Sequence, residues 1–267
     1  MAIRRGNDSP KGSGRLGPAR GGGEDLATAA GSYWGMSDSL ERIRDQSHWL
    51  GEGRWYRERW LSYGDFFGGM ILRMVGDHYP SFLDEIGKKT ALDWGCGGGA
   101  VTRVLCGLFG TVWGLEISPP TLRECVKRMK EAGGQNFRPV LVPAEGPEEV
   151  LRLIPAGTVD FFFSVGVFKH FPSRGYTRRV LRLAAALMRV NALGLIQYRY
   201  DDGTPKYRPK EGDYARNVIT MTSLTPEDFH RLCTEGGLEV VAQERDTDGE
   251  GEHHQYALVR KTPSPSS

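Results

Sequence analysis

The sequence predicts an α/β fold: a seven-stranded, mostly parallel sheet with one antiparallel strand, helices on both faces and a helical cap at the N-terminus. Short apolar runs alternate with segments of helical periodicity between residues 90 and 200, which is typical of βαβ units. The first apolar run leads into a glycine-rich turn that precedes a helical segment. The last two apolar runs are joined by a short acidic turn, so at least one strand runs antiparallel.

Composition limits the class of protein. The chain has 267 residues, 39% hydrophobic and 25% charged, with a formal net charge of +2. Such values are typical of a soluble globular protein, and they make a nucleic-acid partner unlikely on composition alone. There is no apolar run of membrane-spanning length and no secretory signal, and the four cysteines form no CxxC pair. We therefore expect a cytoplasmic monomer or homodimer with no membrane partner, disulfide framework or metal site.

The two ends of the chain differ from its centre. Residues 1–31 are rich in glycine with interspersed arginine, so we expect a disordered tail, and residues 262–267 are expected to be disordered as well. Residues 32–87 are rich in aromatic side chains and are expected to form a helical cap or lid. Its stripe of Tyr56, Trp60 and Tyr63 is either part of a core or part of a cover over a ligand.

The main domain is expected over residues 88–261. Its strands are expected at residues 90–95, 111–118, 137–144, 159–167 and 193–200, and its helices at 100–110, 119–134, 147–154 and 173–190. Ser118 precedes Pro119 and Pro120, which favours a helix start with the hydroxyl as N-cap and proline in the first turn.

The alternation of strands and helices pauses after Tyr200. Residues 201–223 form a polar connection rich in tyrosine, and a loop of this length in a compact domain is typical of an active-site insertion. A capped helix is then expected over residues 223–237, followed by a hairpin of strands over 238–246 and 253–261.

Glycine is dense in the stretch "DWGCGGG", residues 93–99, although glycine weakens any strand or helix. Between a strand and a helix it has a use: Gly95 permits a tight turn, Gly97 lets the backbone approach a ligand, and Gly99 lets the helix pack near the strand. Glu116 ends the second strand 23 positions after Asp93, close to the spacing at which a carboxylate meets a ribose diol in dinucleotide folds. These features alone leave a nicotinamide oxidoreductase open.

Residues 93–99 resemble the D-x-G-x-G-x-G motif of the class I S-adenosylmethionine-dependent methyltransferases, and the chain is similar to their small-molecule, secondary-metabolite members. Glu116 resembles the family's ribose-binding acid, and residues 144–145 fall where the family contacts adenine. "VDFFFSVGVFKHF" resembles the fourth motif, on which Asp160, Ser164 and His170 are matched.

This resemblance spans about residues 85 to 260 and implies a Rossmann-like class I methyltransferase fold with S-adenosyl-L-methionine as the cofactor. It implies the following cofactor-binding residues: Asp93, Gly95, Cys96, Gly97, Glu116, Ile117, Ala144, Glu145, Ser164 and Val165.

The resemblance implies in-line transfer of the sulfonium methyl group to a nucleophile, a reaction in which the protein mainly orients the reactants. A hydroxyl acceptor also benefits from a general base. His170, with an ordinary pKa near 6.5, is the first candidate for this base, and Tyr33, Tyr200 and Tyr214 are weaker candidates. In the competing interpretation, local backbone hydrogen bonds satisfy His170.

The acceptor is expected to be a small, aromatic or partly apolar metabolite that reacts through oxygen, nitrogen or carbon. The fourth strand ends in "FSVGVF" rather than the Asn/Asp-Pro-Pro-Tyr/Phe motif of adenine N-methylases, which argues against methylation of a nucleic-acid base. Two alternatives remain: an RNA methyltransferase that uses the basic tail, and a catalytically silent partner subunit with the same fold. Intact Asp93, Glu116 and glycines count against the silent subunit.

Overall fold

A computed structural model of the chain describes residues 23–35, 54–210, 212–218, 220–245 and 253–263. Its centre is one seven-stranded sheet with the order β3-β2-β1-β4-β5-β7-β6. The strands are β1 (Thr90–Trp94), β2 (Thr111–Glu116), β3 (Phe137–Leu141), β4 (Val159–Ser164), β5 (Met188–Arg199), β6 (Leu238–Arg245) and β7 (His254–Lys261). Only β7 is antiparallel to its neighbours, β5 and β6, so the predicted sheet is confirmed.

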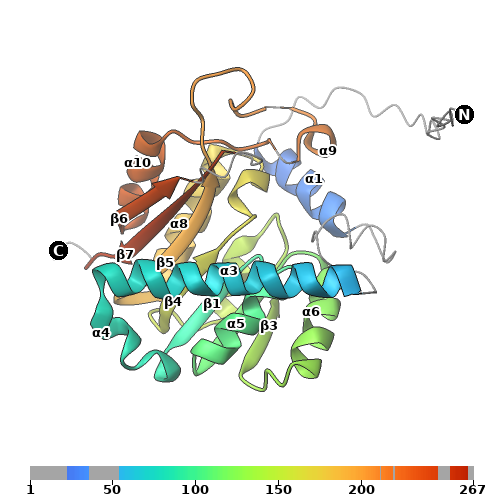
Figure 1. Ribbon diagram of the computed structural model, residues 1–267. Helices are drawn as coiled ribbons and strands as arrows, with labels where there is room; N and C mark the ends of the chain where they lie inside the picture. The colour runs from blue at the N-terminus through green and yellow to red at the C-terminus, as the bar shows by residue number, and fades with distance from the viewer. Residues whose placement is uncertain (1–22, 36–53, 211, 219, 246–252, 264–267) are drawn as a thin grey trace, which may run out of the picture.

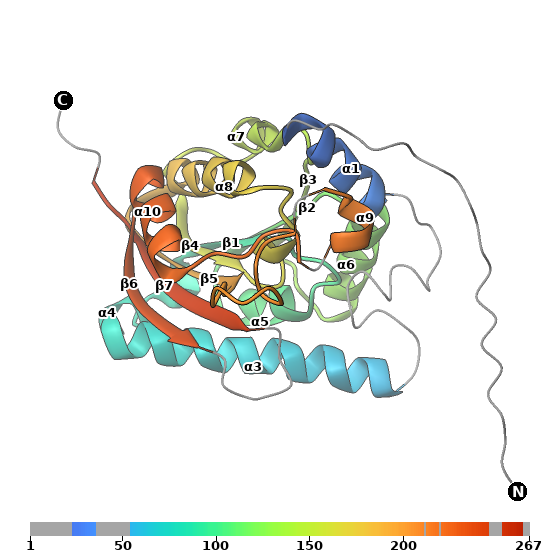
Figure 2. The same cartoon turned by 90° about the horizontal axis from the view of Figure 1, so that it is seen from above.

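Helices cover both faces of this sheet (Figures 1 and 2). One layer holds α3 (Arg54–His78), α5 (Ala100–Leu108) and α6 (Pro119–Glu131), and the other holds α7 (Val150–Leu153), α8 (Arg174–Leu187) and α10 (Pro226–Gly236). The short elements are α4 (Pro80–Leu83), α9 (Tyr214–Asn217), η1 (Ile86–Lys88), η2 (Pro147–Glu149) and η3 (Phe168–His170). No helix in the described ranges combines the length and the apolar character needed to span a bilayer.

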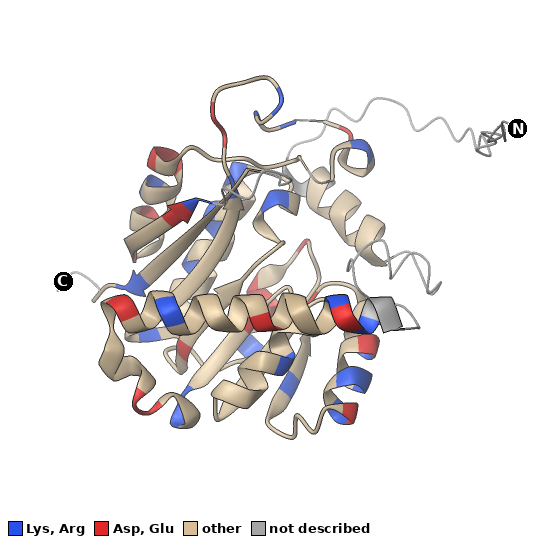
Figure 3. Cartoon of the chain, viewed as in Figure 1, with Lys and Arg blue, Asp and Glu red and all other residues tan. Residues whose placement is uncertain are grey.

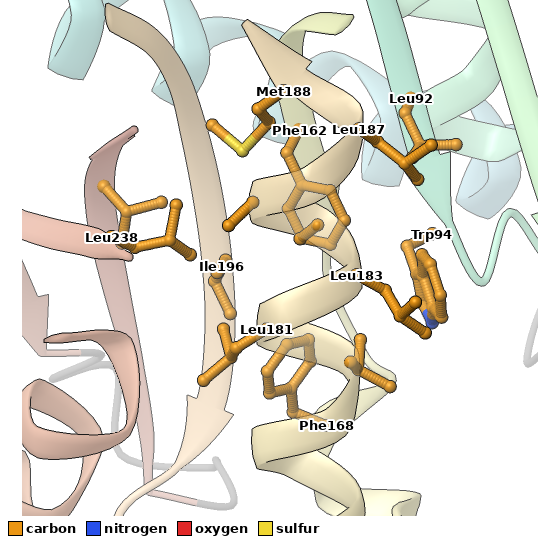
Figure 4. Packing of buried hydrophobic residues seen from close by; sticks show 14 of the residues in the cluster. Leu92, Trp94, Phe162, Phe168, Leu181, Leu183, Leu187, Met188, Ile196 and Leu238 are labelled. Carbon is orange, nitrogen blue, oxygen red and sulfur yellow. The ribbon is translucent and has the colours of Figure 1, made fainter. Parts of the chain in front are cut away.

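The middle of the sheet is buried on both faces. All six residues of β4 are buried, because helices lie above and below a strand in this position. Successive side chains point to opposite faces, so Phe161 and Phe163 pack toward α3 and α5 while Phe162 packs toward α8. In Figure 4, Phe162 lies among Leu183, Leu187 and other apolar side chains of that second core.

The helix that carries the aromatic stripe covers a face of the sheet. Residues 32–87 were expected to form a cap or lid, and the described part is helical, but α3 packs along α5 as a member of the helical layer. Phe67, Ile71 and Met74 of α3 are buried in the core beneath it. Only the side nearer its start reaches the ligand pocket described below.

The N-terminal prediction is wrong in part. Residues 1–31 were expected to be disordered, yet residues 23–31 belong to helix α1 (Gly23–Gly35). Ala30 of this helix is buried against a cluster that includes Ala144, Tyr214 and Met221. The helix is therefore stabilised by residues more than 100 positions away, a contact that the composition of the segment does not reveal. Residues 1–22 lie outside the described residues.

Two boundaries also differ from the prediction. The helix expected over residues 173–190 ends at Leu187, and β5 begins at Met188, five residues before the expected strand. The pairing of β4 with β5 shifts register here, and Asn191 adopts a φ of +65°, so the start of β5 is irregular and its sequence does not alternate cleanly. The expected loop over residues 201–223 contains α9, and its ends meet in a bridge between Tyr200 and Leu224.

Candidate functional site

The glycine turn between β1 and α5 adopts the backbone conformation that its composition predicts. Gly95, Gly97 and Gly99 have φ values of +81°, +52° and +83°, in the left-handed region that favours glycine. A side chain at Gly95 would also collide with the loop after β4, because its Cβ would lie 2.3 Å from a methyl carbon of Val167. The bare backbone thus lets two neighbouring loops meet at the carboxyl edge of the sheet.

Two buried carboxylates flank this turn. Asp93, 3% exposed, accepts a hydrogen bond of 2.7 Å from the hydroxyl of Thr102 on α5. Glu116, 9% exposed, accepts from the backbone N–H groups of Gly97 (3.0 Å), Ile117 (2.8 Å) and Ser118 (3.0 Å). Glu116 therefore ties the end of β2 to the glycine turn.

Burial dominates the electrostatics of both groups. It raises the pKa of Asp93 to about 7, against the lowering effect of the Thr102 hydrogen bond, and the nearby charge of Glu116 raises it further. Burial also raises the pKa of Glu116, although its three backbone donors act in the opposite direction. Among the described residues, no lysine or arginine forms an ion pair with either carboxylate. A ligand with a positive charge and hydroxyl groups would supply an opposite charge and hydrogen-bond donors to these two carboxylates.

One pocket joins these groups, with a cavity volume of about 170 Å³. Its walls come from the ends of β1, β2 and β4 and from α1, α3 and α9, as expected at the carboxyl edge of a parallel sheet. Eight of the ten predicted cofactor-binding residues line it: Asp93, Gly95, Cys96, Gly97, Glu116, Ile117, Ala144 and Val165.

The other two predicted cofactor residues do not line the pocket. The Ser164 hydroxyl is fully buried and donates to the carbonyl oxygen of Trp94 at 2.9 Å, so it links β4 to β1. Glu145 is exposed, and its carboxylate lies beside Gly31 of α1. Asp160, matched by the fourth motif, lies at the far end of β4, where it accepts from the backbone N–H of Thr90.

His170, on η3, lies in the pocket wall with a defined orientation. Its Nδ1 is 2.7 Å from the carbonyl oxygen of Val218. A carbonyl oxygen only accepts, so Nδ1 carries the proton and the lone pair of the neutral ring is on Nε2. The ring packs against Trp34 of α1 in an edge contact, with 5.1 Å between centroids.

The three tyrosines predicted as weaker base candidates have other roles. Tyr214 lines the pocket, but its hydroxyl donates to the carbonyl oxygen of His170 (2.7 Å) and accepts from Trp34 Nε1 (2.9 Å), and burial raises its pKa. Tyr33 packs edge-on against Trp34 and Tyr214. Tyr200 stacks on His253 beneath Arg245, outside the pocket lining.

Aromatic side chains from the N-terminal helices complete the pocket. Trp60 of α3 donates from Nε1 to the carbonyl oxygen of Gly98 at 3.0 Å, so it braces the glycine turn. The hydroxyl of Tyr63 lies 3.6 Å from the point where a Cβ on Gly166 would lie. The helical spacing of Trp60 and Tyr63 was visible in the sequence and fitted a core equally well, whereas Trp34 lies in a helix that was only expected as part of a cap.

Comparisons with known proteins agree with this geometry. A family model described as a methyltransferase domain matches residues 91–191. The structure of magnesium protoporphyrin IX methyltransferase from Synechocystis PCC 6803 with bound SAM has a TM-score of 0.61 at 14% sequence identity, and the match covers 89% of this chain and 98% of that one. No curated protein matches the chain by sequence.

Two further solved structures have the same fold. A Burkholderia thailandensis 1,6-didemethyltoxoflavin-N1-methyltransferase has a TM-score of 0.59 and 17% identity, covering 96% of this chain and 95% of that one. A putative sarcosine dimethylglycine methyltransferase from Galdieria sulphuraria has a TM-score of 0.57 and 16% identity, covering 89% and 98%. Residues 91–191 thus match a methyltransferase domain, and the chain has the Rossmann-like fold found in class I S-adenosylmethionine-dependent methyltransferases.

Proposed function

We propose that this protein is an S-adenosylmethionine-dependent methyltransferase that methylates a small molecule. The observation that carries the proposal is the pair of buried carboxylates, Asp93 and Glu116, which face one pocket beside a glycine turn without a cationic partner among the described residues. S-adenosylmethionine offers an ammonium group, a sulfonium and two ribose hydroxyls, which are the donors and charges that such a site requires.

Different residues of the pocket would bind different parts of this cofactor. Asp93 would receive the positively charged end, Glu116 the ribose hydroxyls, and Ile117 and Ala144 would pack against the adenine. When bound, the cofactor supplies a methyl group that the positive sulfonium has already activated. The protein contributes orientation, which can lower a barrier by roughly 7–11 kcal/mol, and removal of a proton from the acceptor. His170 is the group that we assign to this proton transfer, through Nε2.

Two features support a small acceptor. Side chains of α1 and α9, such as Ala30, Trp34 and Tyr214, form part of the wall of a pocket whose cavity volume of about 170 Å³ suits a small molecule. The solved structures with this fold include enzymes whose names give a porphyrin, a toxoflavin precursor and sarcosine as substrates.

Calorimetry tests the proposal directly. S-adenosylmethionine and S-adenosylhomocysteine should each bind the purified protein, and NAD should not. Incubation with candidate acceptors should then produce, by mass spectrometry, a gain of one CH₂ on a small molecule. Binding of NAD in place of the two adenosyl compounds would instead assign a nicotinamide enzyme. Methylation of RNA alone would leave the cofactor assignment intact and overturn the small-molecule acceptor.

A further inference from the structure

The part of the pocket beyond the cofactor carboxylates indicates what kind of acceptor it takes. We propose, on the basis of the function proposed above, that the acceptor is an uncharged, planar compound that carries its reacting atom as O–H or N–H. The inference depends on three properties of the pocket: the charges of its lining, the nature of its side chains, and the proton state of His170.

The lining has charge at one end only. Among the described residues that line the pocket, Asp93 and Glu116 are the only carboxylates, and none is lysine or arginine. Both carboxylates lie at the ends of β1 and β2, the half that we assign to the cofactor. The half beyond β4 is lined by Val165, Gly166, Val167 and Phe171 among others. An acceptor with its own ionised group would lose water there and gain no partner of opposite charge from the described residues of this half.

Three aromatic side chains of the pocket suit a flat molecule. Tyr63 from α3, Trp34 from α1 and Tyr214 from α9 bring aromatic rings to the pocket from three separate elements. The Tyr63 hydroxyl lies beside Gly166 in the loop after β4, and the φ of +73° at Gly166 is in the region that favours glycine. Gln197 holds that loop in place, because its Oε1 accepts from the N–H of Gly166 at 2.7 Å. Rings with fixed positions favour a planar ligand through stacking and edge contacts.

The contact with Val218 selects, for a neutral His170, the tautomer that a protic acceptor requires. Its Nδ1–H donates to Val218, so Nε2 of the neutral ring can take a proton. As the acceptor oxygen or nitrogen forms its new bond to the methyl carbon, the bond from that carbon to sulfur would break, with its electron pair staying on sulfur, and S-adenosylhomocysteine would leave. The acceptor's bond to hydrogen would break with its electron pair staying on the acceptor, and the proton would pass to Nε2 and then to solvent. A carboxylate acceptor has no such proton to give, and a quaternary ammonium has no electron pair with which to react.

The titratable groups around the imidazole leave this assignment intact. Tyr214 of α9 bonds to the backbone of His170, and Tyr33 of α1 packs on Tyr214. Burial raises the pKa of Tyr214, so it stays neutral where a histidine titrates. Lys169, its neighbour on η3, is buried and is not part of the lining. Asp93 titrates near neutral pH itself, so a pH–rate profile alone would mix the two groups.

The test uses three probes on one ring system: 2-naphthol, 2-naphthoate and trimethyl-2-naphthylammonium. Each is titrated calorimetrically into the full chain saturated with S-adenosylhomocysteine. We expect 2-naphthol to bind at least about tenfold more tightly than either charged probe, since the described lining of this half offers no partner to a carboxylate or an ammonium. Tyr63→Leu should weaken naphthol binding at least about fivefold, whereas Phe66→Leu, at an exposed position of the same helix, should not.

Nitrogen NMR of histidine-labelled protein gives a second readout that needs no acceptor. Nε2 of neutral His170 should resonate as an unprotonated ring nitrogen, and a proton on Nε2 would overturn its assignment as the proton acceptor. Equal or tighter binding of a charged probe, or no binding of 2-naphthol to the loaded protein, would overturn the acceptor class. If S-adenosylhomocysteine itself gives no heat of binding, the proposed function fails instead, and the two failures are therefore distinguishable.

Discussion

Asp93 is a carboxyl group for which burial disfavours the charged form. The folded protein holds its pKa at about 7, above the ordinary 3.8, so the folded state binds this proton more tightly than the unfolded chain does. Stability from this group is therefore fully present below about pH 4 and is lost as the pH rises through about 7. The carboxylate that remains at higher pH is the form that a cationic ligand requires, which gives a physical reason to keep a destabilising group there.

Asp93→Asn should remove this dependence. Asparagine is neutral and can still accept the Thr102 hydrogen bond, so the variant should gain stability over the wild type as the pH rises from about 4 to about 8, by up to on the order of 4 kcal/mol. Urea denaturation of both proteins without ligand, at several pH values, measures the difference. A constant difference over this range would contradict the assignment of the shift to Asp93.

Gly95 tests whether the glycine turn is required for close approach or only for its φ angle. Alanine at Gly95 meets both a φ of +81° and a contact of 2.3 Å with Val167, whereas alanine at Gly133 meets only a φ of +76° in open space. Both changes should cost about 1–2 kcal/mol in backbone strain, and Gly95→Ala should cost more and weaken binding of S-adenosylhomocysteine. Urea denaturation and calorimetry of the two alanine variants distinguish these roles. Equal losses of stability and unchanged affinity for S-adenosylhomocysteine would mean that Gly95 is required only for its φ angle.

At the scale of residues, the sequence predicted the position of those site residues that lie at or just after the end of a strand. Asp93, Gly97 and Glu116 lie at strand ends whose position follows from the apolar runs, so their place in the pocket could be read from the spacing. Ser164 could not, because its hydroxyl bonds to Trp94 on a neighbouring strand, and motif matching does not show where a side chain at a strand end points. Tyr200 lies outside the pocket lining for a similar reason, since its ring stacks on His253, the residue before β7.

At the scale of elements, α3 and α5 approach each other through glycines. A Cβ at Gly64 would lie 2.2 Å from the backbone oxygen of Ala100, and one at Gly68 would lie 2.5 Å from a methyl carbon of Val104. Gly69, the next residue of the same helix, has nothing within 4 Å. The two inward glycines therefore set the distance between these helices, and α3 carries Trp60 and Tyr63 into the pocket from this base.

Gly64→Ala should push α3 away from α5. The contact is with rigid backbone, so we expect a loss of about 1–3 kcal/mol in the free energy of unfolding, and weaker cofactor binding as Trp60 moves from Gly98. Gly68→Ala should cost less because the Val104 side chain can rotate. Gly69→Ala is the control, and it should stabilise by up to about 1 kcal/mol through helix propensity. Thermal or urea unfolding ranks the three variants, and a Gly64 variant as stable as the Gly69 variant would contradict this packing.

The elements that the sequence predicted well are those whose own residues carry a capping residue or an alternation of apolar and polar side chains. Ser118 caps α6 as expected, since its side chain accepts from the N–H of Thr121, and the hairpin strands β6 and β7 lie where the alternation placed them. Helix α1 lacks a comparable signal. Its short apolar face, with Ala27 and Ala30, becomes informative only when α9 and the end of β3 are brought beside it by the fold.

At the scale of the whole molecule, charge is dispersed. Figure 3 shows Lys and Arg alternating with Asp and Glu along α3 and α6, in agreement with a net charge of +2. Many of the pairs lie at the surface, such as Arg73 with Glu244 and Arg179 with Glu148, and contribute little to stability. The arginines of residues 1–22 are the charges that the RNA-binding alternative would use.

Two truncations separate the tail from helix α1. Deletion of residues 1–22 should leave the unfolding midpoint and the affinity for S-adenosylhomocysteine unchanged, because the glycine-rich composition of that segment predicts no stable contacts. Deletion of residues 1–35 also removes Ala30 and Trp34 from the pocket wall, breaks the bond from Trp34 to Tyr214 and exposes His170. We expect this longer deletion to weaken ligand binding about tenfold or more, since several apolar and hydrogen-bonding contacts of about 1 kcal/mol each are lost. Calorimetry on the two truncated proteins provides the comparison. If deletion of the first 22 residues already causes the whole loss of affinity, and the logarithm of the affinity falls linearly with the logarithm of the salt concentration, the tail is an electrostatic anchor. If only the longer deletion lowers the affinity, and salt does not change the loss, α1 is the wall of a small-molecule site.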